Sequence, residues 1–487
     1  MRSLVMRPNR RDLTGIGLSA AAVLTLAPTT GAMARTPARA EADAWDEARA
    51  IRARIRPPVF PRANRFSPAD FGGKPDGMTD ATDAFRQAIM AASGAPGGGR
   101  VVVEDGIWLT GPIHMKSNVE LHVARGARIL FSRDPAGHFP PVLTRYEGTE
   151  FMGVSPLIYA LDCENIAITG QGVLDGNADA TTWWRFKPGA DSDVGDPARL
   201  RRMAEGGVPV AERIFGPETT VRPQFLQPYR CKNVLIEDVT MVRSPMWEIH
   251  PVECENVTVR RVTISSHGPN NDGCDPESCK DVLIEDCVFD TGDDCIAIKS
   301  GRNADGRRRA IPTENVIIAG CTMKDGHGGV TLGSEISGGV RNVFVENCRL
   351  DSPHLNTAIR FKNNAMRGGR LENIHIRDVV VGQVGRAAIT IDYNYGEGAN
   401  GSYPPVFRGL TIERLTVGNC ERALDLQGFA HAPIRDIRLI NCDFHNAAQP
   451  DIVSNVEGLT YVNVRRNDVA VSGPTPGGVV RPANRHG

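Results

Sequence analysis

Residues 270–299 read NNDGCDPESCKDVLIEDCVFDTGDDCIAIK, and this stretch decides the fold. Its middle, DVLIEDCVF from Asp281, alternates apolar and polar side chains in two short runs, as strands with one buried face do. Asp272 precedes these runs, and the pair Asp293 and Asp294 follows them. Each acidic residue stands next to glycine or small polar residues, where a strand is expected to turn. We therefore expect one coil of a solenoid here, with acidic groups at its corners.

A phrase like the one at Asp281 recurs along the chain from Glu164 onward. Each copy begins with Asn, Asp or Gly, the anchor, and continues with apolar-x-apolar, two polar residues and apolar-x-apolar. The clearest copies are NVLIEDVTM from Asn233, NVTVRRVTI from Asn256, DVLIEDCVF from Asp281, NVIIAGCTM from Asn315, NVFVENCRL from Asn342, NIHIRDVVV from Asn373, GLTIERLTV from Gly409 and DIRLINCDF from Asp436. Successive copies are 23 to 36 residues apart, a period that with inner alternation is typical of a β-solenoid.

Two columns of this repeat contain most of the cysteines. Two positions before the anchors lie Cys163, Cys231, Cys254 and Cys279, and six positions after them lie Cys287, Cys321, Cys348 and Cys442. These are inward positions of a solenoid, where cysteine acts as a small apolar residue, so we expect no disulfide framework among them. Outside the columns are Cys274, Cys295 and Cys420, for which a Cys274–Cys295 bridge is the pairing considered.

The β-solenoid is expected to fill residues 63–470, between a linker at 35–62 and a disordered tail at 471–487. A short helix is expected within the linker, over residues 43–55. An open solenoid end exposes its core, so terminal units are expected to be capped. Residues 79–92 place apolar side chains at helical spacing behind Thr or Asp, which predicts an N-terminal capping helix.

The segment 177–222 interrupts the repeat and contains Trp183 and Trp184. Two interpretations are open. The segment is a surface excursion that packs its tryptophans on the solenoid, or it is a wall beside a binding groove in which the tryptophans stack on sugar rings.

The first 34 residues predict an export signal. Arg10 and Arg11 belong to a basic start, an apolar stretch follows over 16–26, and Ala32-Met33-Ala34 fits a cleavage site. The arginine pair resembles a twin-arginine signal. We therefore expect a periplasmic or secreted protein, with no further segment suited to a membrane helix. The formal net charge of -1 gives no drive toward nucleic acid or anionic membranes.

Further polar residues follow the anchors at spacings like those of the acids. His327 lies on the coil after Asp293 and Asp294, Arg360 and Lys362 lie on the next, and Tyr393 and Tyr395 on the one after that. All leave the coil after the same strand, so we expect them on one face. Paired carboxyls can protonate a leaving oxygen and activate water, and clustering keeps one of them protonated. Arg and Lys nearby suit a carboxylated sugar.

Four segments in order carry a family resemblance: NND at 270–272, GDD at 292–294, GHG at 326–328 and RFK at 360–362. They resemble the NTD, GDD, GHG and RIK motifs of the polygalacturonases, glycoside hydrolase family 28. Asn271 and Phe361 depart from the commonest form. The resemblance covers nearly the whole mature chain and is most like the bacterial exo-acting members. It implies an all-β fold, a single-stranded right-handed parallel β-helix.

The resemblance also implies roles. Asp293 would be the general acid, Asp272 and Asp294 would hold and deprotonate water, and His327 would act beside the acid. Arg360, Lys362, Tyr395 and Asn270 would bind the sugar, with Tyr393 the second choice for the tyrosine. The family inverts, so the acid and base carboxyls are expected about 6.5–9.5 Å apart. No cofactor and no metal are expected, and a monomer is the expected state.

The expected reaction is hydrolysis of α-1,4 galacturonosyl linkages in pectic polysaccharide. Three alternatives stay open: a rhamnogalacturonan hydrolase, a pectate lyase-type enzyme on the same fold, and a non-catalytic polysaccharide-binding β-helix. Exo or endo action, the neighbouring sugar and the role of the 177–222 segment are not decided by the sequence.

Overall fold

A computed structural model describes residues 44–187 and 195–474. The expected export signal at 1–34, the first part of the linker and most of the expected tail lie outside the described residues. Within the described part, no helix is both long and apolar enough to cross a membrane.

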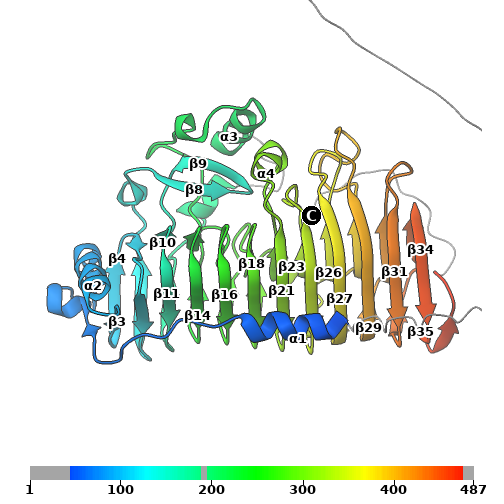
Figure 1. Cartoon of the computed structure of the whole chain (residues 1–487), viewed down its shortest axis with the longest axis horizontal. Coiled ribbons are helices and arrows are strands. Elements are labelled where there is room, and N and C mark those ends of the chain that lie inside the picture. The colour runs from blue at the N-terminus through cyan, green and yellow to red at the C-terminus, as the bar shows by residue number, and fades with distance from the viewer. Residues whose placement is uncertain (1–43, 188–194, 475–487) are drawn as a thin grey trace, which may run out of the picture. The chain divides into compact units, whose positions relative to one another are not determined.

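The described chain winds into stacked coils, each with three sides made of parallel strands (Figure 1). The first side holds β1 (Arg65–Phe66), β3 (Gly99–Val103), β6 (Val119–Val123), β11 (Glu164–Thr169), β14 (Lys232–Glu237), β16 (Glu255–Arg260), β18 (Lys280–Glu285), β21 (Thr313–Ala319), β24 (Val340–Glu346), β27 (Arg370–Gln383), β29 (Val406–Cys420), β31 (Ile434–Ile440) and β34 (Val456–Val462). The second side holds β2 (Asp76–Asp80), β4 (Gly106–Thr110), β7 (Ala127–Phe131), β12 (Val173–Asp175), β15 (Thr240–Val242), β17 (Thr263–Ser266), β19 (Val288–Thr291), β22 (Thr322–Met323), β25 (Arg349–Leu350), the later halves of β27 and β29, β32 (Asp443–Ala447) and β35 (Val464–Arg466).

The third side carries the residues of interest. It holds β5 (Ile113–His114), β10 (Ile158–Leu161), β13 (Leu226–Tyr229), β20 (Ile296–Ile298), β23 (Gly326–Leu332), β26 (Leu355–Lys362), β28 (Ala387–Asp392), β30 (Arg422–Gln427) and β33 (Ile452–Ser454). Single bridges through Ile249 and Cys274 connect β13 to β20. The side chains that point inward from all three sides form one continuous apolar core.

The backbone conformation explains why the anchors of the repeat are mostly Asn or Asp. Asn233, Asn256, Asp281, Asn315 and Asn342 all have φ between 56° and 62°. Asn and Asp tolerate this left-handed conformation better than other side chains do. The asparagine amides also bond from coil to coil: Asn256 Nδ2 donates to Asn233 Oδ1 at 2.7 Å, and Asn342 Nδ2 to Asn315 Oδ1 at 2.9 Å. The anchor column is therefore a hydrogen-bonded ladder at one corner of the coil.

All eleven cysteines are buried and free, as expected for the two columns. The pairing considered for Cys274 and Cys295 is wrong. Both thiols are free. In the parallel register Cys274 lies opposite Ile296 of the next coil, and the Cys295 thiol lies 3.6 Å from the Thr291 hydroxyl.

Both ends of the stack are covered. The capping helix predicted over 79–92 is α2 (Thr82–Gly94), which buries Phe85, Ala88, Ile89 and Ala92 on the first coils. It begins later than expected because residues 76–80 form β2, which pairs with β4. At the far end β36 (Val469–Val471) folds back antiparallel on β35.

The helix expected over residues 43–55 is α1 (Ala44–Arg54), which lies along the outside of the first side (Figure 1). Its buried face packs Trp45, Ala48 and Ile51 on Leu283, Ile317 and Phe344 of β18, β21 and β24. This part of the expected linker is therefore docked on the coils.

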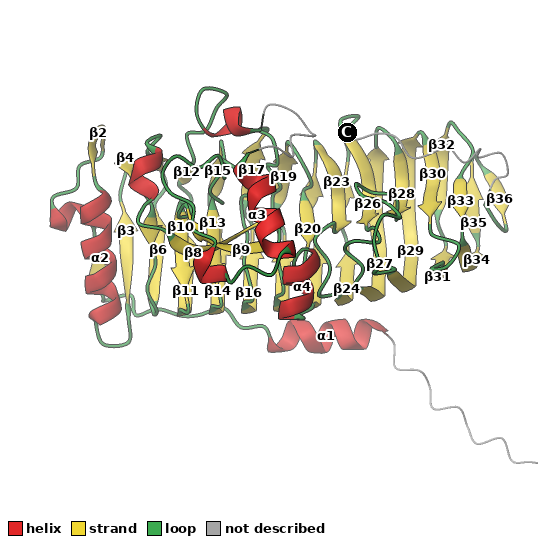
Figure 2. Cartoon of the chain, turned by 90° about the horizontal axis from the view of Figure 1, so that it is seen from above, coloured by secondary structure: helices red, strands yellow, loops and turns green. Residues whose placement is uncertain are grey.

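The 177–222 segment forms the short helix Trp183–Phe186, α3 (Asp196–Glu205) and a turn at Val210–Glu212. Trp183 is 2% exposed and packs with Trp247 and Phe215, and Trp184 Nε1 donates to the Ser244 carbonyl at 2.8 Å. The packing interpretation therefore fits Trp183. In Figure 2, α3 and α4 (Asn303–Arg309) lie beside the hairpin of β8 (Val142–Tyr146) and β9 (Thr149–Gly153).

Candidate active site

The predicted site residues come together on the third side of the coil. The register aligns Cys274 with Ile296, Ile296 with Val330, Val330 with Ile359, and Ile359 with Ile389. Asp272 precedes the first of these strands, Asp294 precedes β20, His327 is the second residue of β23, and Arg360 and Lys362 end β26. The stacking predicted from the spacing is therefore present.

The three carboxylates form a tight cluster. One oxygen from each of Asp272, Asp293 and Asp294 lies within 4.8 Å of the others. The approach follows from the fold, since Asp272 lies one coil before Asp293 and Asp294 and parallel strands lie only about 4.8 Å apart. It concerns single oxygens, so the separation of about 6.5–9.5 Å expected between the acid and base carboxyl groups of an inverting pair stays a prediction.

Exposure separates the three acids. The Asp293 side chain is 17% exposed, whereas those of Asp272 and Asp294 are 4% and 0% exposed. Asp293 is therefore the most accessible of the three carboxylates from solvent.

Each acid has its own cationic partner. His327 Nδ1 lies 2.9 Å from Asp293 Oδ1. Lys362 Nζ donates to Asp294 Oδ2 at 2.5 Å, and Arg360 Nη1 lies 3.4 Å from Asp294 Oδ1. Arg360 and Lys362 also face one side of the Tyr395 ring, at 5.8 and 5.3 Å from its centre. Tyr393 instead lies in the core against Phe429, so the structure places Tyr395 rather than Tyr393 at the site.

The pKa shifts of Asp272 and Asp293 have opposite signs. Burial, with the charges of Asp275 and Asp293, raises the pKa of Asp272 well above its usual range, although Lys299 opposes it. Burial also raises the pKa of Asp293, but His327, Lys362 and Arg360 together outweigh it and hold the pKa of Asp293 well below its usual range. Asp293 in turn raises the pKa of His327. These directions favour an imidazolium ion beside an ionised Asp293, whereas Asp272 ionises only at a higher pH than an ordinary carboxyl group does.

The turn that carries Asp272 is fixed by amide hydrogen bonds. Asn271 is fully buried, and its Oδ1 accepts from the Ser266 hydroxyl at 2.8 Å and from the Gly268 amide at 2.7 Å. Its Nδ2 donates to the Ser244 and Met246 carbonyls, both at 3.1 Å. The residue that departs from the usual motif thus ties the turn to the preceding coil. The buried Arg222 donates to Asn270 Oδ1 at 2.5 Å, which leaves the Asn270 amide NH₂ for other partners.

Several buried charges near the site were not singled out from the sequence. Asp275 and Glu248 are fully buried, and none of their carboxylate oxygens has a hydrogen-bond partner in the described chain. Burial raises the pKa of both well above the usual range. Asp275 could have been noticed three positions after Asp272 in the same turn, whereas Glu248 stands in an apolar phrase that carries no such signal.

The arginine-rich segment 301–310, which contains α4, does not form a free cationic patch. Arg302 pairs with Glu147, Glu335 and Glu397, Arg308 with Glu150, and Arg309 with Glu253. The Arg302 amide also donates to the Gly148 carbonyl at the tip of the β8–β9 hairpin, at 3.0 Å. These contacts join the hairpin to the coil that carries Asp293, and we call the hairpin with α3 and α4 the wall beside the site.

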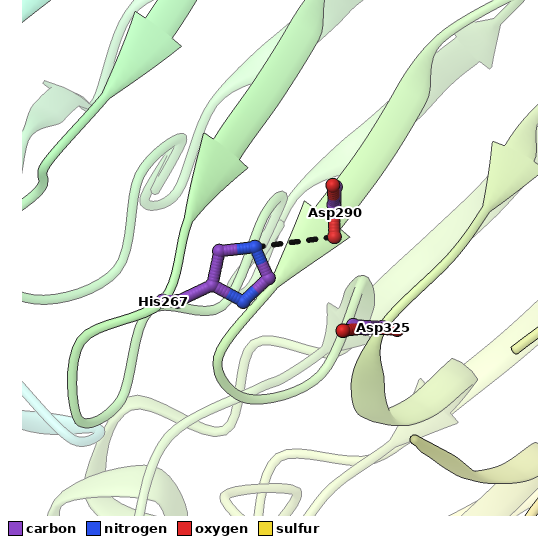
Figure 3. Close-up of side chains that lie close together, drawn as sticks. All are labelled: His267, Asp290 and Asp325. Carbon is purple, nitrogen blue, oxygen red and sulfur yellow. Dashed lines mark ion pairs between the residues drawn. The ribbon is translucent and has the colours of Figure 1, made fainter. Parts of the chain in front are cut away.

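A second side-chain cluster lies at the same corner, outside the site (Figure 3). His267, Asp290 and Asp325 come from three successive coils, and His267 Nε2 lies 3.1 Å from Asp290 Oδ1. The Ser352 hydroxyl binds Asp325. The ion pair and this hydrogen bond account for the cluster.

Known proteins resemble this chain along most of its length. The sequence model of glycosyl hydrolases family 28 matches residues 216–429. A probable polygalacturonase of Vitis vinifera is 30% identical over 82% of this chain and 79% of its own. The exo-poly-alpha-D-galacturonosidase of Dickeya chrysanthemi is 27% identical over 81% of this chain and 70% of its own.

The crystal structure of a hyperthermoactive exopolygalacturonase from Thermotoga maritima matches with a TM-score of 0.84 at 42% identity, over 89% of this chain and 99% of that one. These likenesses confirm the predicted right-handed parallel β-helix and the predicted resemblance. The chain is a glycoside hydrolase, and it belongs to glycosyl hydrolase family 28.

Proposed function

We propose that this chain is a polygalacturonase that hydrolyses α-1,4 galacturonosyl linkages in pectic polysaccharide, acting from a chain end. One observation carries the proposal. The cluster of Asp272, Asp293 and Asp294 lies directly beside the cations Arg360 and Lys362. Carboxyls can cleave a glycosidic bond, and adjacent cations select a sugar that bears a carboxylate.

Arg360, Lys362, Tyr395 and Asn270 are proposed to bind the substrate. The guanidinium and ammonium groups would pair with a uronate carboxylate, since Arg360 and Lys362 retain side-chain exposures of 15% and 7%. The Tyr395 ring would pack on the sugar, and the Asn270 amide would donate to a hydroxyl group.

Asp293 is proposed as the general acid because it is the most exposed of the three carboxyls. Its proton comes from the imidazolium of His327 along their hydrogen bond of 2.9 Å. Lys362 and Arg360 lower the pKa of Asp293 in the free protein. Their pairing with a uronate offsets this effect, so substrate binding itself favours the protonated acid.

Asp272 and Asp294 are proposed to hold the attacking water, and Asp272 accepts its proton as the water oxygen bonds to the anomeric carbon. The glycosidic oxygen leaves with the proton from Asp293. Lys362 and Arg360 engage Asp294, and Lys299 lies 3.6 Å from Asp272, so both carboxylates are held in place to act on water. We therefore propose inversion, which NMR of the first anomer released would test.

Action at a chain end is supported by the wall beside the site. The β8–β9 hairpin, α3 and α4 are interlocked there through Arg302, and Arg201 of α3 binds Glu147 at the hairpin tip. We propose that this wall blocks the polymer on one side of the acids, so that a chain end stops against it. The relatives from Dickeya chrysanthemi and Thermotoga maritima are named as exo-acting enzymes.

The proposal includes the cell compartment and the oligomeric state. Residues 1–34 would direct export, by the twin-arginine route because of Arg10 and Arg11, and the mature protein would be periplasmic or secreted. The solenoid would act as a monomer, because both ends of the stack are capped. N-terminal sequencing of the exported protein would locate the cleavage site.

The test is incubation of the mature protein with polygalacturonate in the presence of EDTA, with Asp293→Asn as the matched variant. We expect new reducing ends without an unsaturated product, and loss of activity in the variant. An unsaturated product would identify a lyase. Turnover of rhamnogalacturonan alone would change the substrate, and binding without turnover would identify a carbohydrate-binding protein.

A further inference from the structure

Lys299 occupies a buried position next to the catalytic carboxylates. It directly follows β20 and is 2% exposed. Its Nζ lies 3.6 Å from Asp272 Oδ2, 3.9 Å from Asp275 Oδ2 and 3.4 Å from Glu335 Oε2. The Trp247 ring covers another side, with its centre 4.2 Å from Nζ. One ammonium group therefore serves three buried carboxylates.

Asp272 depends on this ammonium group alone. Asp293 pairs with His327, and Asp294 pairs with Lys362 and Arg360. For Asp272, Lys299 is the one cation within 4.0 Å that residues 44–187 and 195–474 provide, and Asp272 Oδ1 has no hydrogen-bond partner among them.

Several charges act on Asp272 from the turns around it. Asp275 in its own turn, and Asp293 and Asp294 on the next coil, raise the pKa of Asp272 in addition to burial, and Lys299 lowers it. Burial also acts on Lys299, but Asp275, Glu335 and Asp272 together raise the pKa of Lys299 well above its usual value, so it remains charged.

We propose that Lys299 is a positioning residue of the hydrolysis: its ammonium group stabilises the ionised form of Asp272 that takes the proton from water, and Glu335 limits this effect by sharing the same group. The inference rests on the proposed function and deepens it. Neither residue lies in the four motifs that carry the family resemblance.

Glu335 extends the connection to the wall. It also pairs with Arg302 at 3.4 Å, and Arg302 pairs with Glu147 at the hairpin tip at 3.3 Å. An unbroken series of charges thus runs from Asp272 through Lys299, Glu335 and Arg302 to the wall.

The two partners of this pair give opposite expectations. Without the lysine charge, Asp272 keeps its proton to higher pH, so Lys299→Met moves the acid limb of the kcat profile upward by about 1–3 pH units. Without the glutamate charge, the Lys299 ammonium group interacts more strongly with Asp272, and the repulsion between the two carboxylates is lost. Glu335→Gln therefore moves the acid limb to lower pH. Lys299→Arg keeps the charge and retains a limb close to that of the wild type.

The experiment measures the pH profile of polygalacturonate hydrolysis for the wild type and these variants. Lys280→Met, an exposed lysine on the first side of the coil, is the matched control and leaves the profile unchanged. Infrared titration of the Asp272 carboxyl, read as the difference from the same protein with Asp272→Asn, follows the shift without substrate. If Lys299→Met fails to fold, the infrared titration of Glu335→Gln still tests the proposal, because the pKa of Asp272 is expected to fall in that variant.

Shifts of opposite sign support the proposal, since a general loss of structure cannot produce them. If the wild type hydrolyses polygalacturonate and the acid limbs and infrared titrations coincide in all variants, this inference is wrong and the proposed function stands. If the wild type does not hydrolyse polygalacturonate, the proposed function is wrong, and the infrared titration still decides whether Lys299 and Glu335 control Asp272.

Discussion

His327 Nδ1 lies 2.9 Å from Asp293 Oδ1, and this pair stores the proton that the proposed reaction needs. The pKa of His327 is raised by Asp293, so the pair keeps its proton above the usual pKa of histidine and loses it as the pH rises further. The alkaline limb of the activity profile is therefore assigned to this pair.

His327→Asn removes the stored proton but keeps a polar side chain. We expect kcat to fall about 100-fold to 1000-fold, within the range of general acid catalysis, and the alkaline limb to move to lower pH. The measurement is the pH dependence of kcat on polygalacturonate. An unchanged alkaline limb would show that another group holds the proton.

Arg360→Gln removes a cation that is proposed to bind the uronate. We expect KM for polygalacturonate to rise about tenfold to hundredfold, because a charged hydrogen bond is worth about 1.5–3 kcal/mol. Binding of a methyl-esterified oligomer, which lacks the carboxylate charge, serves as the control and should change much less. An equal loss for both ligands would show that Arg360 acts only by supporting Asp294.

Asn271→Ala removes four hydrogen bonds that hold the turn of Asp272. Buried groups left unpaired cost about 1–3 kcal/mol, so we expect a loss of about 2–3 kcal/mol in the free energy of unfolding and a lower kcat. Denaturant unfolding and steady-state kinetics give the two values. Asn446→Ala, at an exposed asparagine whose amide donates to the Gly418 carbonyl, is the control and should cost far less.

The N-terminal segment 44–56 spans the coils that carry the proposed site. Arg54 binds Asp281 through two hydrogen bonds, at 2.6 and 3.0 Å, at the one aspartate among the asparagine anchors from 233 to 373. The backbone of Arg56 brackets Asn256, donating to its Oδ1 at 2.9 Å and accepting from its Nδ2 at 2.7 Å. The segment therefore braces the first side of the coil, whereas the acids lie on the third side.

A double-mutant cycle with Arg54→Met and Asp281→Asn tests this brace. The Arg54 side chain is 45% exposed, so solvent screening limits the expected coupling energy to about 0.5–1 kcal/mol. Asp281→Asn restores the asparagine ladder, so this single change should cost less than Arg54→Met. Additive effects of the two changes would rule out a direct contribution from the pair.

Much of the fold could be predicted from the sequence because each copy of the repeat depends on the conformation and polarity of residues close together in the chain. The anchors need left-handed residues, the columns need small apolar side chains, and both recur at a visible period. The motif residues were also found this way, since parallel stacking brings together residues that leave successive coils after the same strand. Asp272, Asp293 and His327 are examples.

What the sequence could not provide depends on contacts between distant segments. Lys299 and Glu335 meet only after folding, and the docking of Trp45 on Phe344 joins residues that are far apart in the sequence. Nor did the sequence indicate that His327, Lys362 and Arg360 lower the pKa of Asp293 while burial raises that of Asp272. The Cys274–Cys295 pairing failed because register rather than sequence proximity decides which residues face each other.

The most direct test of the central claim uses a galacturonate oligomer tagged at its reducing end, with products separated over time. The account predicts untagged galacturonate from the first time point and a tagged chain that shortens one residue at a time, with neither product formed by Asp293→Asn. Tagged products of all lengths appearing together would contradict action from the chain end. An intact oligomer would contradict the proposed activity itself.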